Sequence, residues 1–561
     1  MKIKTLVNLL TWVLLTGLLS SCLKDLNTLP LNKKQLINED VYKTAEGYRG
    51  VLAKCYGSLI LNGQAGPDSD GDLGGLDVGY SGYTRALFYL QECTTDEVAL
   101  HSGSSQGSRD LLFMTWNPST VIIKYAYYRL YMSIGYCNEF LRESADDKLK
   151  ERGLYDALKD EIGYYRAEVR FIRAYCYSMI CDLYGSGPYI DESMPVGVIP
   201  QQKSREDIYN YVVAELEMLK DQLKVPGANQ YGRIDQVAAW FLLSRVYLNA
   251  EAWVGKKEYE KAYQYSKSVI GNGYYALAAD YRHIFLADNN TCKEIIWPLM
   301  QDQDNTINSA GTNFLIKALI NGVMSNYYLT GIGARGWGNA RVKTQLVDKF
   351  ESTDQVFDAT DTWGDKKKDK RAQFFTPGHT KETWIAGKAF QNDFNNGYAS
   401  VKWRNVTKDR KDLAEGGTTY SSVNYPMFRV AEAYLAAAEA ILRGAGGSRQ
   451  EALQYVNQIR DRAYLSGTYG SGVSGHITDA QLSLDFLLDE RARELHTESV
   501  RRTDLVRFGK FTKGYNWDWK GSDGAANNYP GKDVADRYKL FPIPQDEFTV
   551  NPNLTQNPEF K

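Results

Sequence analysis

Long hydrophobic runs are scarce in this sequence: there is one, and it stands at the beginning. Residues 9–19 are apolar apart from Thr11, Thr16 and Gly17. Beyond Leu19 no run approaches the roughly 20 residues that a membrane-spanning helix needs. The sequence therefore predicts a soluble body after the first run.

An excess of charge of either sign is also missing. The 561 residues carry 66 Lys and Arg against 68 Asp and Glu, a formal net charge of −2, and the two signs are mixed throughout. A protein that binds nucleic acid through its phosphates needs a basic face. We therefore exclude nucleic acid as a partner.

Motifs for catalysis and metal binding are absent as well. None of the five histidines stands at metal-ligand spacing, and there is no CxxC pair, GxSxG elbow, Walker loop or dinucleotide fingerprint. A chain this long needs no disulfide staples, although oxidation of a pair after export stays open. We expect buried core thiols at Cys55, Cys93, Cys137, Cys176, Cys181 and Cys292.

One acidic loop raises the question of calcium. Asp68, Asp70 and Asp72 alternate in a Gly-rich stretch, as the oxygen ligands of calcium loops do. The bidentate Glu expected at the twelfth position is missing, because Gly79 stands there. We expect a solvated turn and no cofactor, with calcium as the alternative.

The first residues are typical of a secretory signal. Lys2 and Lys4 precede the apolar run, and Leu19-Ser20-Ser21-Cys22 follows it. A Cys after small residues resembles a bacterial lipobox, in which the Cys is acylated and becomes the first mature residue. We expect a signal peptide over 1–21 and a lipid anchor on Cys22 that holds a single domain, 22–561, on a membrane. An ordinary cleaved signal is the alternative.

Helical periodicity dominates the rest of the chain. A tetratricopeptide unit is a pair of amphipathic helices with small residues at the crossing, and the pairs 235–253/258–270 and 428–442/448–464 fit it. Further helices are predicted over 45–61, 120–141, 155–184 and 204–223, the last opened by the capping box Ser204–Asp207. We predict an all-α dominated superhelix of about four pairs, with its frame at about 42–61, 120–297 and 426–510.

Two long stretches, 62–119 and 298–425, lack a sustained period and are rich in Gly, Asn, Asp and aromatics. Loops of this length are usually functional or disordered, and the aromatic content argues against disorder. Sugar rings stack on aromatic faces, while Asn, Asp and Arg bond hydroxyl groups. Trp337 lies between glycines and has little to pack on locally, so its ring face is the first candidate for a ligand contact. The alternative is that the ring packs into the core, as most Trp rings do. The predicted binding residues are Trp337, Tyr80, Tyr83, Arg335, Asn339, Tyr328 and Trp116.

The late helix is dense in charge and raises the alternative of a glycoside hydrolase, which needs two carboxyl groups at a fixed separation. Its acids, such as Glu490 and Glu494, alternate with Arg at spacings of three and four residues, which favours ion pairs. An adjacent Arg lowers the pKa of a carboxyl group, the wrong direction for a general acid. We predict a structural network and no enzyme activity.

Several segments together resemble the SusD/RagB family. RAEVRFIRAY at 166–175 with LYGSGP at 183–188 is similar to the family's central signature, and LDERAREL at 488–495 with RTDLVRFGK at 502–510 is the most specific run. YPMFR at 425–429, LFPIP at 540–544 and NPNLTQNP at 551–558 follow the same order, as does the lipobox.

The resemblance implies a surface-exposed outer-membrane lipoprotein that binds a glycan without catalysis. It also implies a helical superhelix fold and a partner, a TonB-dependent porin of the SusC type that this protein covers as a lid. A peptide- or protein-binding tetratricopeptide adaptor at the outer membrane is the second hypothesis, because tetratricopeptide grooves commonly hold peptides. A groove lined by Asn, Lys and Arg would favour it.

Overall fold

The computed structural model describes residues 38–63, 71–100, 105–321, 324, 330–333, 336–384, 393–465, 475–523 and 531–560. The stretch predicted as a signal peptide, 1–21, lies outside the described residues, as do Cys22, Asp68, Asp70, Tyr328 and Arg335. Among those described, no helix combines the length and hydrophobicity needed to cross a membrane.

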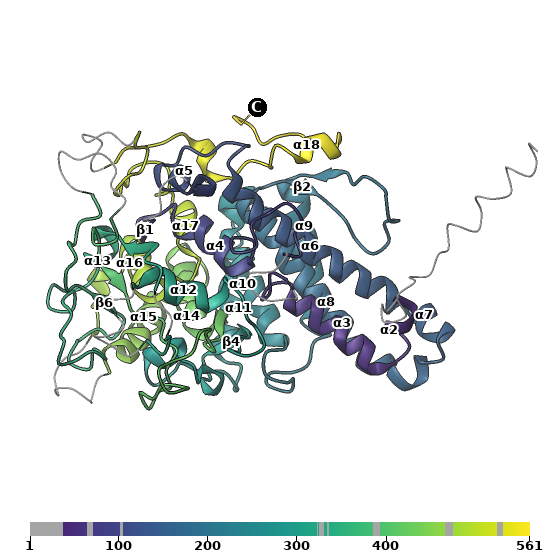
Figure 1. Cartoon of the computed structure of the whole chain (residues 1–561), viewed down its shortest axis with the longest axis horizontal. Helices are drawn as coiled ribbons and strands as arrows, with labels where there is room; N and C mark the ends of the chain where they lie inside the picture. Colours follow the sequence, from purple (N-terminus) through teal and green to yellow (C-terminus); the bar gives the residue numbers. More distant parts are fainter. Residues whose placement is uncertain are drawn as a thin grey trace, which may run out of the picture.

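Helices make up most of the frame (Figure 1), which confirms the predicted fold class. The frame helices are α3 (Ala45–Gly57), α6 (Val121–Glu143), α8 (Tyr155–Leu183), α9 (Arg205–Leu219), α10 (Gln236–Val254), α11 (Tyr259–Ile270), α14 (Val430–Leu442) and α15 (Arg449–Tyr464). Shorter helices are α2 (Asn38–Val41), α4 (Tyr83–Gln91), α5 (Ser108–Phe113), α7 (Asp146–Glu151), α12 (Gly311–Leu319), α13 (Thr344–Val347), α16 (Leu484–Leu495), α17 (Arg501–Arg507) and α18 (Glu547–Val550).

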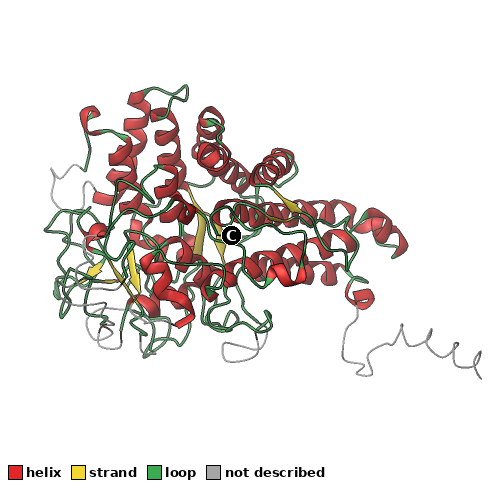
Figure 2. Cartoon of the chain, turned by 90° about the horizontal axis from the view of Figure 1, so that it is seen from above, coloured by secondary structure: helices red, strands yellow, loops and turns green. Residues whose placement is uncertain are grey.

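The frame helices stack in chain order. α3 packs on α6 and α8, α6 on α8, α8 on α9, α9 on α10, α10 on α11, α11 on α14, and α14 on α15. Grouped as α3–α6, α8–α9, α10–α11 and α14–α15, they make the four predicted pairs. Figure 2 shows helices of the frame lying side by side. Fully buried alanines such as Ala238 on α10 and Ala437 on α14 let neighbouring backbones approach closely.

Capping residues set the helix bounds that the sequence predicted best. Ser204 accepts a bond from Asp207 N (3.1 Å) and its own N–H donates to Asp207 Oδ2 (3.3 Å), the predicted capping box. α10 starts after Asp235, which caps Val237 N, and stops at Gly255 with φ +73°. The prediction over 204–223 was too long, because α9 ends at Leu219.

Strands are short and form only two-stranded antiparallel pairs within the described ranges: β1 (Val98–Leu100) with β5 (Ala340–Val342), β2 (Gly187–Pro188) with β3 (Gln202–Lys203), β4 (Ile295–Leu299) with β8 (Tyr425–Arg429), and β6 (Phe374–Phe375) with β7 (Ala399–Ser400). Phe428 was predicted to start a helix. It pairs instead with Trp297 in the β4–β8 ladder, and α14 begins at Val430.

The two predicted insertions are not wholly irregular, and they meet. α4 from the first packs on α12 from the second, and β1 pairs with β5, with Val98 opposite Val342. Arg501 ties α17 to the first insertion through two 2.7 Å bonds to the Asp96 carboxylate. The insertions therefore form one loop-rich body beside the stack.

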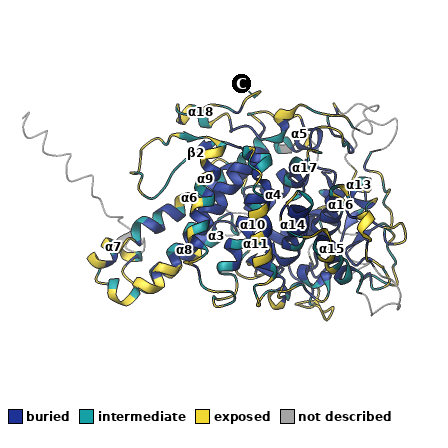
Figure 3. Cartoon of the chain, turned by 180° about the vertical axis from the view of Figure 1, so that it is seen from behind, coloured by how far each residue is buried: buried dark blue, intermediate teal, exposed yellow. Residues whose placement is uncertain are grey.

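The core runs through both parts. Figure 3 shows buried residues through the centre and exposed ones at α7 and the nearby ends of α3 and α8. The predicted core thiols are confirmed: Cys55, Cys93, Cys137, Cys176, Cys181 and Cys292 are all buried and free.

Candidate functional site

Two short helices bring one cation each to the junction of the insertions. Arg85 is the single charged residue of α4 (YTRALFYLQ), and Lys317 is the single charged residue of α12 (GTNFLIKAL). Only 6% of Arg85 and 5% of Lys317 are exposed. A buried charge is costly unless other groups solvate it, so the neighbours of these cations define the site.

Arg85 is surrounded by aromatic rings. Its guanidinium carbon lies 4.0 Å from the ring centre of Tyr80, 4.8 Å from that of Phe314 and 5.7 Å from that of Trp337. Nη1 donates to the carbonyl oxygens of Gly79 (2.9 Å) and Ser309 (3.3 Å). The Arg85 side chain therefore links the two insertions, and its guanidinium makes cation–π contacts with both Tyr80 and Trp337.

Tyr80 contacts two other tyrosines. Its ring is half-buried and stacks on Tyr89 at 5.6 Å and on Tyr125 at 5.7 Å between ring centres. Asp77, which is exposed, accepts a bond from Tyr80 N at 3.1 Å. A carboxylate and a phenol thus stand together at the edge of the cluster.

Trp337 is held by its backbone and keeps its ring partly open. Its N–H donates to Lys317 O at 2.6 Å, and the N–H groups of Gly338 and Asn339 donate to Ile320 O (2.7 Å) and Ala318 O (2.8 Å). A Cβ on Gly336 would lie 2.4 Å from Ile320 O, so only glycine allows this approach. Trp337 as a whole residue is 37% exposed, whereas five other tryptophans are less than 2% exposed: Trp116, Trp297, Trp403, Trp517 and Trp519.

Lys317 completes the cluster. Its Nζ lies 5.6 Å from the ring centre of Trp337 and 5.3 Å from that of Tyr420, which is half-buried. Burial lowers the pKa of Lys317. The arrangement offers an open indole face bordered by phenol, amide, carboxylate and cationic groups, which suits a ligand with apolar ring faces and many hydroxyl groups.

The predicted binding residues divide into three groups, one of which, Tyr328 and Arg335, lies outside the described residues. Trp337 and Tyr80 meet on Arg85, and half-buried Asn339 follows within two residues of Trp337. Tyr83 and Trp116 have no open face: Tyr83 shares a 2.6 Å bond with Tyr175 OH, and Trp116 packs on Phe541 at 4.8 Å. We therefore leave them out of the site.

Sequence reasoning missed Arg85, Phe314, Lys317 and Tyr420. A usable signal existed for the two cations, because each is alone in an apolar run of helical length. Such a charge must find polar or aromatic partners wherever its helix is buried.

The described residues hold no group of three or more His, Cys, Asp or Glu side chains that could bind a metal ion. Asp72 is engaged by Arg129, whose Nη1 and Nη2 donate to the two carboxylate oxygens at 2.7 and 2.6 Å. With Asp68 and Asp70 outside the described residues, the solvated turn stays the prediction and calcium binding its untested alternative.

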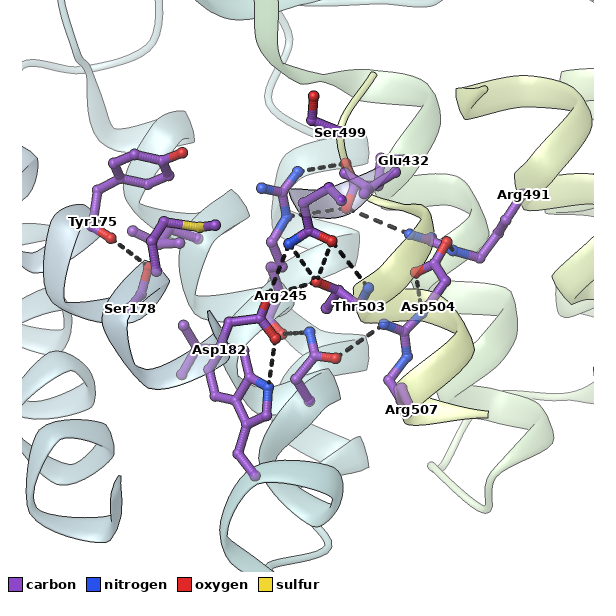
Figure 4. Close-up of a pocket in the computed structure, with 17 residues that line it drawn as sticks. Tyr175, Ser178, Asp182, Arg245, Glu432, Arg491, Ser499, Thr503, Asp504 and Arg507 are labelled. Atoms are coloured by element: carbon purple, nitrogen blue, oxygen red, sulfur yellow. Dashed lines mark hydrogen bonds and ion pairs between the residues drawn. The ribbon is translucent and has the colours of Figure 1, made fainter. Parts of the chain in front are cut away.

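A second concentration of charge lies inside the stack, around a cavity of about 30 Å³ (Figure 4). That volume holds about one water molecule. Arg245 donates to both Glu432 oxygens (3.1 and 2.6 Å), and Arg491 donates to Asp504 (2.7 Å). Burial alone would raise the pKa of Glu432 and Asp504, but these guanidinium groups hold both pKa values below the usual range.

This network matches the ion pairs predicted for the late helix, although most of them run between elements instead of along one helix. Glu494, for example, accepts from Arg429 on β8 at 2.6 Å. Carboxylates with lowered pKa values in a cavity of this size cannot serve as the general acid of a glycosidase.

Comparison with known proteins gives relatives along the whole chain. The pattern of the SusD family matches residues 293–560. The starch-binding protein SusD of Bacteroides thetaiotaomicron is 32% identical over 594 aligned positions, covering 100% of this chain and 99% of that protein. SusD-like protein P25 of Formosa agariphila is 24% identical, covering 72% of this chain and 74% of its own.

Solved structures share the fold. Surface glycan-binding protein A of Bacteroides thetaiotaomicron, in complex with laminarihexaose, superposes with a TM-score of 0.65 at 20% identity, over 91% of this chain and 99% of that one. The protein of the same name from Bacteroides uniformis gives 0.66 at 21% identity, over 92% and 100%.

Proposed function

This chain belongs to the SusD family, and we propose that it is a cell-surface lipoprotein that binds a glycan without catalysis and delivers it to a TonB-dependent porin of the SusC type. The glycan-binding part of this proposal rests on one observation: Trp337 is partly exposed, and the buried Arg85 contacts both its ring and that of Tyr80. A sugar ring stacks on the indole face, and the polar groups around it bond the hydroxyl groups.

The ligand that we propose first is a glucan oligosaccharide. The relative that is 32% identical over the full chain is named for binding starch, and a structural relative carries laminarihexaose. Both ligands are built from glucose. Trp337 supplies the stacking face, which Arg85, with Tyr80 packed on it, borders, while Asp77 and Asn339 supply hydrogen-bonding groups at the border.

The lipid anchor and the porin rest on the family and on the first residues of the chain. Acylation of Cys22 would hold the protein on the outer membrane, since several acyl chains together bind firmly. Delivery to the porin is proposed from family membership alone. No residue of the candidate site is assigned a role in it.

The peptide-binding alternative loses its main support. A groove of about 730 Å³ does lie between α8, α9 and the β2–β3 connection, and arginines line it. Those arginines are engaged within the protein: Arg170 donates to Glu215 at 2.8 Å, Arg166 donates to Asp146 at 2.7 Å, and Arg173 pairs with Glu192. No observation favours this function over glycan binding.

A panel of oligosaccharides tests the proposal. Purified protein is titrated calorimetrically with maltoheptaose, laminarihexaose, cellohexaose and xylohexaose, and reducing ends are assayed after long incubation with each. We expect saturable binding of at least one glucan and no release of reducing ends. Binding of none of the panel, or turnover of any member, contradicts the proposal.

A further inference from the structure

Two buried carboxyl groups face each other between α4 and β1. Glu92 is the residue that follows α4, and Glu97 immediately precedes β1. Neither residue is more than 1% exposed, and the two side chains share a hydrogen bond. Glu92 Oε2 is buried and receives a hydrogen bond from no other donor among the described residues. Because ionised carboxylates can only accept, two carboxyl groups share a hydrogen bond only when one of them carries the proton.

The charged groups around the pair are largely engaged elsewhere. Arg501 Nε lies 3.7 Å from Glu97 Oε1, but its guanidinium makes two shorter bonds, both of 2.7 Å, to Asp96. Lys402 favours the charge on Glu92, yet it bonds another carboxylate at 2.7 Å. Burial therefore raises the pKa of Glu92 to about 7, and burial together with Glu92 raises the pKa of Glu97 well above its usual value. The other titratable groups that face the pair are Cys93 and Tyr425.

The pair also holds a strained turn between α16 and α17. Thr497 and Ser499 both have a φ of +62°, which residues other than glycine rarely adopt, least of all a β-branched Thr. Thr497 N donates to Glu97 Oε2 at 3.2 Å, and Val500 N donates to Glu92 Oε1 at 3.1 Å. α17, which follows the turn, packs on α4. The two carboxyl groups therefore join α4, β1 and this turn at one buried point.

This point connects the two sides of the candidate site. α4 carries Arg85 and ends before Glu92. β1 pairs with β5, which begins three residues after Trp337, and the N–H group that follows β5 donates to Glu97 O at 2.8 Å. Residues 92–97 therefore join the helix that carries Arg85 to the strand pair that follows Trp337.

We propose that Glu92 and Glu97 share one proton and act as positioning residues for the glycan site, whose affinity falls when that proton is lost. This inference deepens the proposed function and rests on it. Two ionised carboxylates at hydrogen-bond distance in a buried position repel each other and lack solvation. Their separation shifts α4 against β1, and with it Arg85 against Trp337. The shared proton keeps these elements in the arrangement described above.

Affinity measured across pH tests this proposal. The full-length protein is titrated calorimetrically with the tightest-binding neutral glucan of the panel from pH 6 to pH 8.5, because the pKa of Glu92 lies between these values. We expect Kd to rise at least five-fold over this range in the wild type. Glu92→Gln, whose amide donates to Glu97 as the protonated acid does, should keep its pH 6 affinity throughout. Glu46→Gln, at an exposed position of α3, is the matched control and should follow the wild-type profile.

A second readout follows the proton itself. Infrared difference spectra of the ligand-free wild type should contain the carbonyl band of a protonated carboxyl group at pH 6 that is lost by pH 8.5, and Glu92→Gln should lack this band. Burial lowers the pKa of Lys317 in the site, but its titration would alter the affinity of both proteins alike.

The outcomes separate this proposal from glycan binding itself. A flat affinity profile in a wild type that binds glycan, an equal rise of Kd in Glu92→Gln, or absence of the carbonyl band overturns the shared proton and leaves the glycan site in place. If no glycan of the panel binds at any pH, the proposed function fails, and this proposal fails with it.

Discussion

The guanidinium carbon of Arg85 lies 4.0 Å from the ring centre of Tyr80, and this pair stands where the two insertions contact each other. The same guanidinium bonds a carbonyl in each insertion, Gly79 O at 2.9 Å and Ser309 O at 3.3 Å. A planar group with several donors can do both at once, whereas an ammonium group cannot reproduce that geometry.

Arg85→Lys should therefore weaken glycan binding although it keeps the charge. We expect about a ten-fold rise in Kd, roughly 1.4 kcal/mol, because Tyr80 and Trp337 lose their common support. Calorimetric titration measures it. Arg49→Lys, at an arginine with an exposed side chain that pairs with Glu161, is the control and should bind as the wild type does. Unchanged affinity in Arg85→Lys would show that the cation does not organise the site.

Substitutions of Tyr80 and Tyr83 should have different effects on glycan affinity, although the two residues are only three positions apart. Tyr80→Ala should raise Kd several-fold, because it removes the ring that Arg85 holds at the border of the site, and should also lower stability through the lost ring contacts. Tyr83→Phe should lower the free energy of unfolding by about 1–2 kcal/mol, since it removes the 2.6 Å bond to buried Tyr175 OH, and should leave Kd unchanged. Titration and urea unfolding of both variants check this; the reverse pattern would move the site to Tyr83.

The buried charge network should be structural. Glu494 is fully buried and accepts hydrogen bonds from Arg429 (2.6 Å) and Arg371 (3.2 Å). Glu494→Gln removes one of the negative charges that these two cations share with other buried carboxylates, and we expect a loss of about 3–5 kcal/mol in the free energy of unfolding. Glu206→Gln, which breaks an exposed pair with Lys256, should cost at most about 1 kcal/mol. Equal losses in urea unfolding would contradict this reading.

Stability should depend on pH through a pair of buried carboxyl groups in the first insertion. Burial raises the pKa of Glu92 from 4.5 to about 7, and burial together with Glu92 raises the pKa of Glu97 well above its usual value. Between pH 4.5 and 7 the folded state thus binds more protons than the unfolded state, so the free energy of unfolding falls as pH rises through this window.

Glu92→Gln removes that penalty. Relative to wild type, we expect the variant to gain on the order of 2 kcal/mol between pH 5 and pH 8, measured by urea unfolding at both values. Glu46→Gln, at an exposed position of α3, is the control and should follow the wild-type curve. A wild-type stability that rises from pH 5 to pH 8 in step with that of Glu92→Gln would contradict the assignment.

The sequence predicts the frame well where local signals suffice. The predicted helix 235–253 and the observed Gln236–Val254 differ by one residue at each end, because Asp235 and Gly255 mark both ends locally. Helix α4 escaped prediction because each of its nine residues is buried, so it has no polar face to give a period. Phe428 escaped because its partner in β4 is remote in the sequence.

The candidate site was predictable in part. Trp337 stands out because glycines flank it, and Gly336 is required by the approach to Ile320 O. Tyr80 and Tyr83 could not be told apart from the sequence, because the choice depends on where α4 begins. The helix starts at Tyr83 and turns that ring into the core, whereas Tyr80 lies before it.

Titration of Trp337→Ala with the best glycan of the panel tests the central claim most directly, because this ring is the open face that the account assigns to the sugar. Tyr274→Ala, which removes an equally exposed aromatic ring (42% against 37%), is the matched control. We predict that Kd rises at least ten-fold for Trp337→Ala, about 1.4 kcal/mol or more, and stays at the wild-type value for Tyr274→Ala. Wild-type affinity in a folded Trp337→Ala protein would contradict the account.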